Sequence, residues 1–233
     1  MKILSIECSA VPCSAAIIED NKIIASAFTN VKLTHSETLM PMVESLLASA
    51  KLSISDIDTF AVAEGPGSFT GIRIGISAIK GMAQPLKKPC VGVSTLLSMA
   101  YNYIDTDAIV CAVMDARCNQ VYNALFEIKG GVITRICKDR ALLFDELKAD
   151  LEKYSEQNII VVGDGADIFY PTVKNFRNIK IANSINRYQN AVSVAFAALE
   201  MLNLGNTKDY SQLLPVYLRL PQAERELKLK KEN

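Results

Sequence analysis

Short apolar runs alternate along the chain with segments whose apolar residues recur every three to four positions. The runs predict buried strands, and the helical spacing predicts amphipathic helices that cover them. In the first half we expect strands at 3–8, 14–18, 23–28, 58–63 and 90–93, and helices at 38–50, 70–84 and 95–103. The first helix is expected to begin only near Thr38, because Pro41 lacks the amide that a regular preceding turn uses.

The second half repeats this order. We expect strands at 109–114, 121–128, 132–137, 159–162 and 179–182, and helices at 142–154, 168–176 and 191–204. From about Thr207 the sequence is polar, and it ends in a charged run, so this tail is expected to be frayed. The order β-β-β-α-β-α thus occurs twice, starting near residues 2 and 109, which predicts an α/β protein with two domains, 1–104 and 105–233.

Two local matches support this duplication. Glu7 and Asp115 each place an acid just after the first strand of a half. The motifs 65–67 (Gly-Pro-Gly) and 163–165 (Gly-Asp-Gly) each follow the fourth strand, where we expect Asp164 to serve the turn. Residue identity between the halves is otherwise low, so the repeat rests on element order. Two such domains are expected to face each other across a cleft.

Composition narrows the class of protein. The 233 residues carry 25 Lys and Arg against 25 Asp and Glu, so no global positive field attracts nucleic acid and only a local patch remains open. The six cysteines show neither CxxC pairs nor finger-like spacing. Together with the lack of a signal peptide and of any run long enough to cross a membrane, this predicts a cytoplasmic protein with reduced thiols.

The stretch 64–84, EGPGSFTGIRIGISAIKGMAQ, carries the strongest signal. Gly65, Gly67 and Gly71 permit backbone angles that other residues resist, and Ser68 or Thr70 is placed to cap the helix that follows. A glycine-rich turn into a helix N-terminus is also a place where anions bind. The turn therefore has two interpretations, a phosphate site or the base of a protein-binding surface.

Five segments resemble the bacterial TsaB (YeaZ) family. They are ILSIECSAVPCSAAI, THSETLMPMVESLL, AVAEGPGSFTGIRIGISAIKGMA, VGVSTLLSMA and MDARCNQVYNALF, and they span roughly residues 2–127, with weaker support at 163–166 and 215–219. The repeated element order resembles the superfamily of actin, sugar kinases and Hsp70. The resemblance implies two tandem actin-like (ASKHA, ribonuclease H-like) domains.

The resemblance also implies a function in the synthesis of threonylcarbamoyladenosine next to the tRNA anticodon. In that family, TsaB is a non-catalytic subunit that activates and scaffolds TsaD, the catalytic subunit. TsaE is an ATPase of the same complex, and TsaC makes the threonylcarbamoyl-adenylate donor. The expected partners are therefore TsaD through the N-terminal helices, TsaE and tRNA through the complex, and a second copy of the chain in isolation.

The residues themselves disfavour catalysis by this chain. Members of the superfamily hold ATP phosphates with two hairpins, each an acid followed by small residues. The first hairpin, 7–14, has no glycine and contains Pro12, and the second, 115–120, has bulky residues in place of glycines. No cofactor is expected to be required, although weak nucleotide binding stays open. The candidate anion or nucleotide contacts are Glu7, Ser9, Ser14, Arg73, Asp115 and Arg117.

Several of these residues also have structural interpretations. Glu7 and Asp115 are either general acid–base partners or inherited acids that cap loops, and the second is favoured because no activating neighbour is visible. For Arg73 an ion pair is favoured over an anion contact. Cys8 and Cys13 are predicted to pack in the core.

The histidine content limits metal and peptidase chemistry. His35 is the only histidine, and Leu39 stands where TsaD-like relatives have the second histidine of a metal-binding HxxxH motif. No metal site is therefore expected, and Ser-His-Asp or HExxH peptidase chemistry is disfavoured. The alternative to a non-catalytic subunit is an ATP-using small-molecule kinase or transferase of the actin-like superfamily.

The two N-terminal helices predict a partner interface. The helix at 70–84 has one apolar stripe through Ile72, Ile76 and Ile79 and another through Ile74, Ala78 and Met82, and a helix that is apolar on two sides is buried on two sides. The helix before it adds flexible methionines suited to an interface. Coverage of both faces within the monomer is the alternative. The predicted interface residues are Leu39, Met40, Met42, Val43, Leu46, Leu47, Gly71, Ile72, Gly75, Ile76, Ile79 and Met82.

Overall fold

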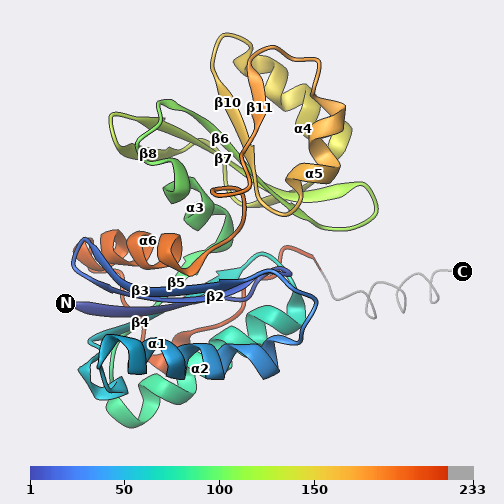
Figure 1. The fold of residues 1–233 in the computed structure, drawn as a ribbon. Helices are drawn as coiled ribbons and strands as arrows, with labels where there is room; N and C mark the ends of the chain where they lie inside the picture. Colours follow the sequence, from blue (N-terminus) through green and yellow to red (C-terminus); the bar gives the residue numbers. More distant parts are fainter. Residues whose placement is uncertain (220–233) are drawn as a thin grey trace, which may run out of the picture.

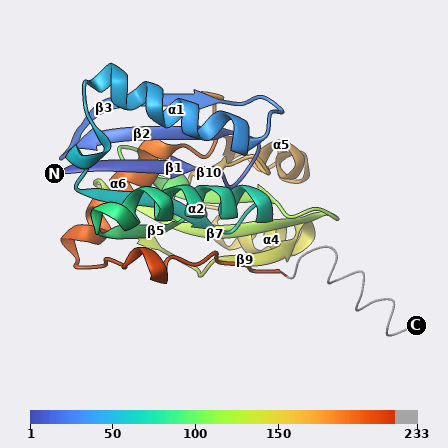
Figure 2. The same cartoon turned by 90° about the horizontal axis from the view of Figure 1, so that it is seen from below.

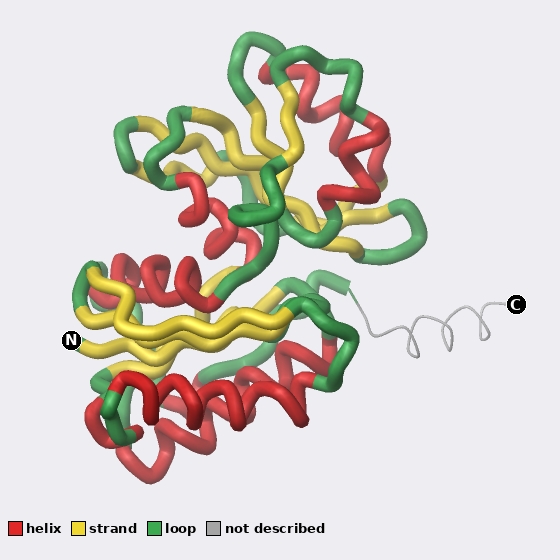
Figure 3. The backbone as a smooth tube through the Cα atoms, in the orientation of Figure 1, coloured by secondary structure: helices red, strands yellow, loops and turns green. Residues whose placement is uncertain are grey.

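The first sheet is built from five strands in the order β3-β2-β1-β4-β5 (Figures 1 and 3). A computed structural model describes residues 1–219 of the chain. The strands are β1 Lys2–Glu7, β2 Cys13–Glu19, β3 Lys22–Thr29, β4 Thr59–Gly65 and β5 Cys90–Ser94. The first three are antiparallel neighbours, whereas β4 runs parallel to β1 and β5 parallel to β4.

The second sheet repeats this topology. Its path is β11-β10-β6-β7-β8, with β9 paired to β7. The strands are β6 Ala108–Asp115, β7 Gln120–Lys129, β8 Val132–Arg135, β9 Arg140–Leu143, β10 Ile159–Val162 and β11 Ile179–Ile181. From the antiparallel edge, both sheets run third, second, first, fourth, fifth, so the tandem α/β fold predicted from element order is confirmed. The sequence missed β9, which was assigned in part to the following helix.

Helices cover both faces of the first sheet. On one face lie α1 His35–Ala50 and α2 Phe69–Leu86, side by side in Figure 2, and on the other lies α6 Ala191–Asn203. The second sheet is covered on its outer face by α4 Phe144–Leu151 and α5 Ala166–Phe169. On its inner face lies α3 Thr95–Ala100, which also touches α6. Short 3-10 turns lie at Ile54–Asp56, Tyr101–Tyr103, Glu152–Tyr154, Tyr170–Thr172 and Tyr210–Gln212.

Each sheet is covered in part by a helix from the other half of the chain. A division of the chain at residue 104 does not predict this arrangement. Although α3 follows the first sheet in the chain, it packs on the second, and α6 follows the second sheet but packs on the first. Two buried serines hold the start of α6 there: Ser5 Oγ donates to the Ala191 carbonyl, and Ser14 Oγ accepts from its amide at 2.9 Å. Packing rather than chain order therefore assigns α6 to the first domain.

Residues 207–219 are docked, so the expectation of a frayed tail is wrong for this part. Lys208 exchanges both backbone hydrogen bonds with Cys90, and its ammonium lies 2.7 Å from the Glu64 carboxylate. Leu213 is fully buried in the core of the first domain. The charged run at 224–233 lies outside the described residues.

The first helix begins three residues earlier than Pro41 suggested. It starts at His35 and includes the proline, whose missing amide removes one hydrogen bond along the helix. Two contacts hold the early turn in place: His35 Nε2 lies 2.7 Å from the Ala10 carbonyl oxygen, and Leu39 is buried. Tertiary packing therefore overrides the local signal. Across residues 1–219, no helix combines the length and apolar character that a membrane span needs.

Candidate functional site

The glycine turn after β4 is filled by other parts of the chain. A Cβ on Gly67 would lie 2.3 Å from the Ser9 carbonyl oxygen, and one on Gly71 would lie 2.0 Å from that of Cys8. The Ser68 amide donates to the same Ser9 oxygen at 2.6 Å. The turn between β1 and β2 therefore packs directly against the glycine turn, and this close backbone approach explains the glycines.

The helix launched by this turn uses its two apolar sides differently. Ser68 caps the helix by accepting from the Gly71 amide, whereas Thr70 is exposed. The stripe of Ile72, Ile76 and Ile79 packs into the core under the first sheet. The second stripe, which begins with Ile74, is only partly buried. This helix therefore keeps apolar surface after its own sheet has been covered.

A groove lies between α1 and α2 on this side of the molecule. Its cavity is about 500 Å³ in volume. It is lined by His35, Ser36, Leu39, Met40, Phe69, Thr70, Arg73, Ile74, Ser77 and Ala78. Met40 is 45% exposed at its edge, and Arg73 carries the one formal charge among these residues at neutral pH. The small side chains along α2 leave room for another helix to approach.

Burial in the monomer divides the predicted interface residues into two sets. Eight of the twelve are buried, and one of these, Leu39, also lines the groove: Leu39, Val43, Leu46, Gly71, Ile72, Gly75, Ile76 and Ile79. The other four keep exposed surface: Met40, Met42, Leu47 and Met82. Sequence reasoning selected the stripe that faces the sheet, while Ile74 and Ala78 on the other stripe line the groove.

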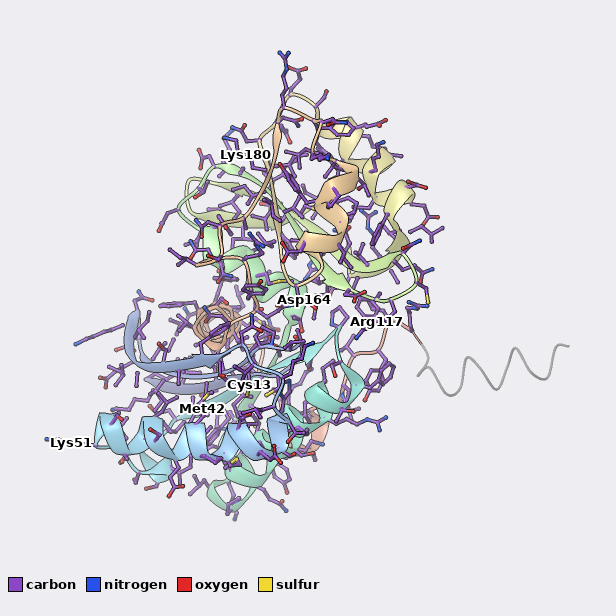
Figure 4. All side chains as sticks on the ribbon, turned by 45° about the vertical axis from the view of Figure 1, so that its right-hand side comes forward. Cys13, Met42, Lys51, Arg117, Asp164 and Lys180 are labelled. Carbon is purple, nitrogen blue, oxygen red and sulfur yellow. The ribbon has the colours of Figure 1, made fainter. Side chains whose placement is uncertain are left out.

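A second cavity, of about 690 Å³, lies between the two domains. It is lined by Ser9, Ala10, Val11, Lys32, Gly67, Ser68, Phe69, Met114, Asp115, Ala116, Arg117, Tyr122 and Asp164. In Figure 4, Asp164 and Arg117 lie where the second domain faces the first. We refer to this cavity as the inter-domain cleft.

Buried carboxyl groups lie at and beneath the floor of the cleft. Glu7 is fully buried, and its Oε1 accepts from the Ser9 amide at 2.5 Å. Burial, with a smaller contribution from the nearby Asp164, raises the pKa of Glu7 to about 7 although Ser9 donates to its carboxylate. Burial also raises the pKa of Asp164 to about 6, although the Gln189 side-chain amide donates to it at 2.6 Å. The lining of the cleft also contains Lys32 and Arg117, so it carries charges of both signs.

Known proteins share this architecture. The family model described as TsaD, tRNA N6-adenosine threonylcarbamoyltransferase, matches residues 22–227. A Bacillus subtilis relative, tRNA threonylcarbamoyladenosine biosynthesis protein TsaB, is 31% identical over 227 residues, and the alignment covers 96% of each chain. The chain belongs to the TsaB family. An Escherichia coli protein of the same description is 30% identical over 221 residues, covering 94% of this chain and 95% of its own length.

A solved structure supports the same assignment. YeaZ from Pseudomonas aeruginosa superposes with a TM-score of 0.78 at 27% sequence identity. The match covers 93% of this chain and 99% of that one. The resemblance to the TsaB (YeaZ) family predicted from five sequence segments is therefore confirmed over nearly the whole chain.

Of the six anion contacts predicted for this TsaB-family chain, three line the cleft: Ser9, Asp115 and Arg117. Arg117 points its largely exposed side chain toward Asp115, with 3.5 Å between guanidinium and carboxylate. Glu7 is enclosed by protein, and Ser14 is engaged by α6, so neither is free for a ligand.

Arg73 lies away from the cleft, in the α1–α2 groove. Its Nε donates to the Tyr217 hydroxyl at 2.7 Å, and within residues 1–219 it forms none of the ion pairs that were expected of it. Asp164 lies in a turn, as predicted, but it also lines the cleft and accepts from Gln189, and neither of these features was predicted. The parallel between Gly-Asp-Gly and Gly-Pro-Gly was the available signal that Asp164 faces the cleft.

The remaining candidate chemistry is structural. Cys8 and Cys13 lie with their sulfur atoms 3.7 Å apart in the core of the first domain, as the packing interpretation predicts. The contact with Cys13 and burial raise the pKa of Cys8, so its thiol stays protonated. Within the described part of the chain, no three His, Cys, Asp or Glu residues are grouped to hold a metal ion.

Proposed function

We propose that the chain is a non-catalytic subunit in the formation of threonylcarbamoyladenosine on tRNA. In this role it binds, activates and scaffolds a TsaD-type catalytic subunit through the groove between α1 and α2. The observation that carries the proposal is the second apolar stripe of α2, which keeps exposed surface after the first stripe has been buried under the sheet.

The groove has the surface expected of a helix-docking site. Met40 and Ile74 provide apolar, adaptable surface, and Ser77 and Ala78 provide the close approach that helix packing needs. The TsaD family model spans most of this chain, so a TsaD-type partner of the same build offers a matching pair of helices. For the same reason a second copy of the chain is the expected occupant when the partner is absent.

The non-catalytic part of the proposal rests on the cleft. The turn between β1 and β2 packs tightly against the glycine turn. Asp115 and Asp164 line the cleft, and Glu7 is buried beneath it. The one histidine of the sequence holds the Ala10 carbonyl. No cofactor of its own is then required, and TsaE and tRNA are reached through the catalytic subunit in the cytoplasm.

Mixing the chain with a purified TsaD-type subunit tests the docking surface. Light scattering should show a heterodimer, and Ile74→Glu or Met40→Glu should weaken it at least tenfold, because each places a charge in the groove. Ile168→Glu is the matched control, since Ile168 is similarly exposed, at 43%, but lies on α5 of the second domain. Unchanged binding by both groove variants would show that the partner docks elsewhere.

The alternative of an ATP-using kinase or transferase has its own test. Calorimetry with ATP and magnesium should detect no micromolar binding by the chain alone. Tight binding with turnover by the purified chain would replace the proposal with that alternative.

A further inference from the structure

Residues 213–219, the C-terminal strap, run from the core of the first domain to the second domain. The strap begins at the fully buried Leu213. The Val216 amide donates to the Glu64 carbonyl at 2.7 Å, at the end of β4. The Val216 carbonyl lies against Gly65, where a Cβ would come within 2.4 Å of it. The strap is therefore fixed to the turn from which α2 starts.

Tyr217, the next residue of the strap, contacts Phe69, a side chain that lines both the groove and the cleft. The Tyr217 ring stacks on Phe69 with 4.4 Å between ring centroids, and its hydroxyl accepts from Arg73. Phe69 is the first residue of α2, and among residues 1–219 it is the only one in the linings of both the groove and the cleft. A change in the position of the Phe69 ring therefore alters the shape of both the groove and the cleft.

The far end of the strap is held by the second domain. Leu218 packs against the core cluster under α3, and the Arg219 guanidinium donates to the Ala116 carbonyl. Ala116 lines the cleft at the start of the loop between β6 and β7. The next three residues of that loop, 117–119, all have left-handed backbone angles, which L-residues adopt reluctantly. The Arg219 contact thus helps to hold a loop with disfavoured backbone geometry.

We propose that the C-terminal strap couples docking in the α1–α2 groove to the opening of the inter-domain cleft. A helix seated in the groove presses Phe69 against Tyr217, which tightens the strap and, through Arg219, the cleft loop. Coupling between two sites is reciprocal, so a change in the cleft also alters affinity at the groove. The partner half of this proposal rests on the proposed function, whereas the tether itself is a property of the isolated chain.

Hydrogen exchange of the isolated chain tests the tether. Arg219→Ala should speed the exchange of amides 115–120 at least fivefold, because the loop loses its link to the first domain. Arg177→Ala, an exposed arginine elsewhere on the second domain, should leave these amides unchanged. Tyr217→Ala should also speed exchange, and Tyr217→Phe, which keeps the stacked ring, should restore most of the protection. Equal exchange in the wild-type chain and in Arg219→Ala would overturn the tether.

Exchange with the TsaD-type subunit bound tests the coupling. In the wild-type chain, amides 115–120 should slow several-fold on binding, and in Arg219→Ala the subunit should still bind without this slowing. Slowing that persists in the variant would overturn the coupling while leaving the docking surface intact. No binding by the wild-type chain would instead overturn the proposed function, and the coupling with it, whatever the isolated chain shows.

Discussion

The two repeats share a sheet topology but differ in the helices that cover their outer faces. In the first repeat, α1 and α2 contain 16 and 18 residues, whereas their counterparts α4 and α5 contain 8 and 4. The short helices suffice to cover the second sheet. The long helices α1 and α2 provide more surface than is needed to cover the first sheet, and a groove lies between them. The difference locates the candidate docking surface on the first repeat.

The glycine turns, in contrast, have the same structural role in both repeats, which is to allow close packing of the backbone. A Cβ on Gly165 would lie 2.8 Å from the Met114 carbonyl carbon, and one on Gly67, its counterpart, would lie 2.3 Å from the Ser9 carbonyl oxygen. Each turn lets the end of the first strand pack against the start of a helix. A feature present in both halves belongs to the fold, so the groove, and not the turn, distinguishes the functional surface.

The largest effect is expected from Gly71→Ala. Because the added Cβ meets the backbone of Cys8, which cannot move without displacing β1, the free energy of unfolding should fall by about 4 kcal/mol. Gly81→Ala in the same helix is the control, since its Cβ meets no atom within 4 Å and alanine favours the helix. Urea denaturation measures both. A small decrease in the free energy of unfolding of Gly71→Ala would mean that the turn between β1 and β2 can shift at little cost.

The buried acid at the end of the first strand of the first repeat, Glu7, should make stability depend on pH. The pKa of Glu7 is raised from 4.5 to about 7, so between these values the folded chain binds more protons than the unfolded chain, and the free energy of unfolding falls as pH rises. Above pH 7, Glu7→Gln should therefore be more stable than the wild-type chain by up to about 3 kcal/mol, and the gain should shrink toward pH 5.

Thermal unfolding of the wild-type chain and of Glu7→Gln across this pH range measures the gain. If Glu7→Gln showed no pH-dependent gain, the Glu7 carboxylate would have to be stabilised in the folded chain.

A smaller effect is expected at the cap of α2. Ser68→Ala removes the side-chain acceptor for the Gly71 amide and should cost about 1 kcal/mol. Ser45→Ala, in the middle of α1 and exposed, should be neutral or slightly stabilising. Chemical denaturation of both variants separates the loss of the cap from the general effect of replacing serine with alanine in a helix. Equal stability of the two variants would show that the Ser68 cap contributes little.

The smallest effect should come from adding a cap to the second repeat. Leu143 occupies the N-cap position of α4 with an extended backbone and is 45% exposed. Leu143→Ser supplies a hydroxyl to a free amide of the first turn and should stabilise the chain by about 0.5 kcal/mol. A loss of stability instead would show that the leucine packs more than its exposure suggests.

Periodicity predicted most elements of the fold, and it failed where local and tertiary signals conflict. Ten of the eleven strands follow from apolar runs, but β9 exists only because Arg140–Leu143 finds an open edge of β7. Pro41 suggested a later helix start, yet the contacts of His35 and Leu39 hold the first turn. In each case a partner distant in sequence decided the outcome.

The predicted interface residues lie on α1 and α2, and most of them face the sheet, whereas the groove is lined in part by the other stripe of α2. Both stripes of α2 are visible in the sequence, because helical spacing reveals that two faces are apolar. Spacing cannot tell which face the sheet covers, since that depends on how the helix is rotated about its own axis. The structure places Ile72 and Ile76 beneath the sheet and Ile74 in the groove.

The sequence by itself determined the repeated α/β order and the family, because these depend on residue type and short-range spacing. Only the tertiary structure decided that α3 and α6 exchange sheets, that residues 207–219 dock, and that Phe69 lies between groove and cleft. Several of these features, such as α6 on β1 and Lys208 beside Cys90, join segments more than a hundred residues apart. Such contacts form because buried surfaces fit one another, and no local pattern in the chain records that fit.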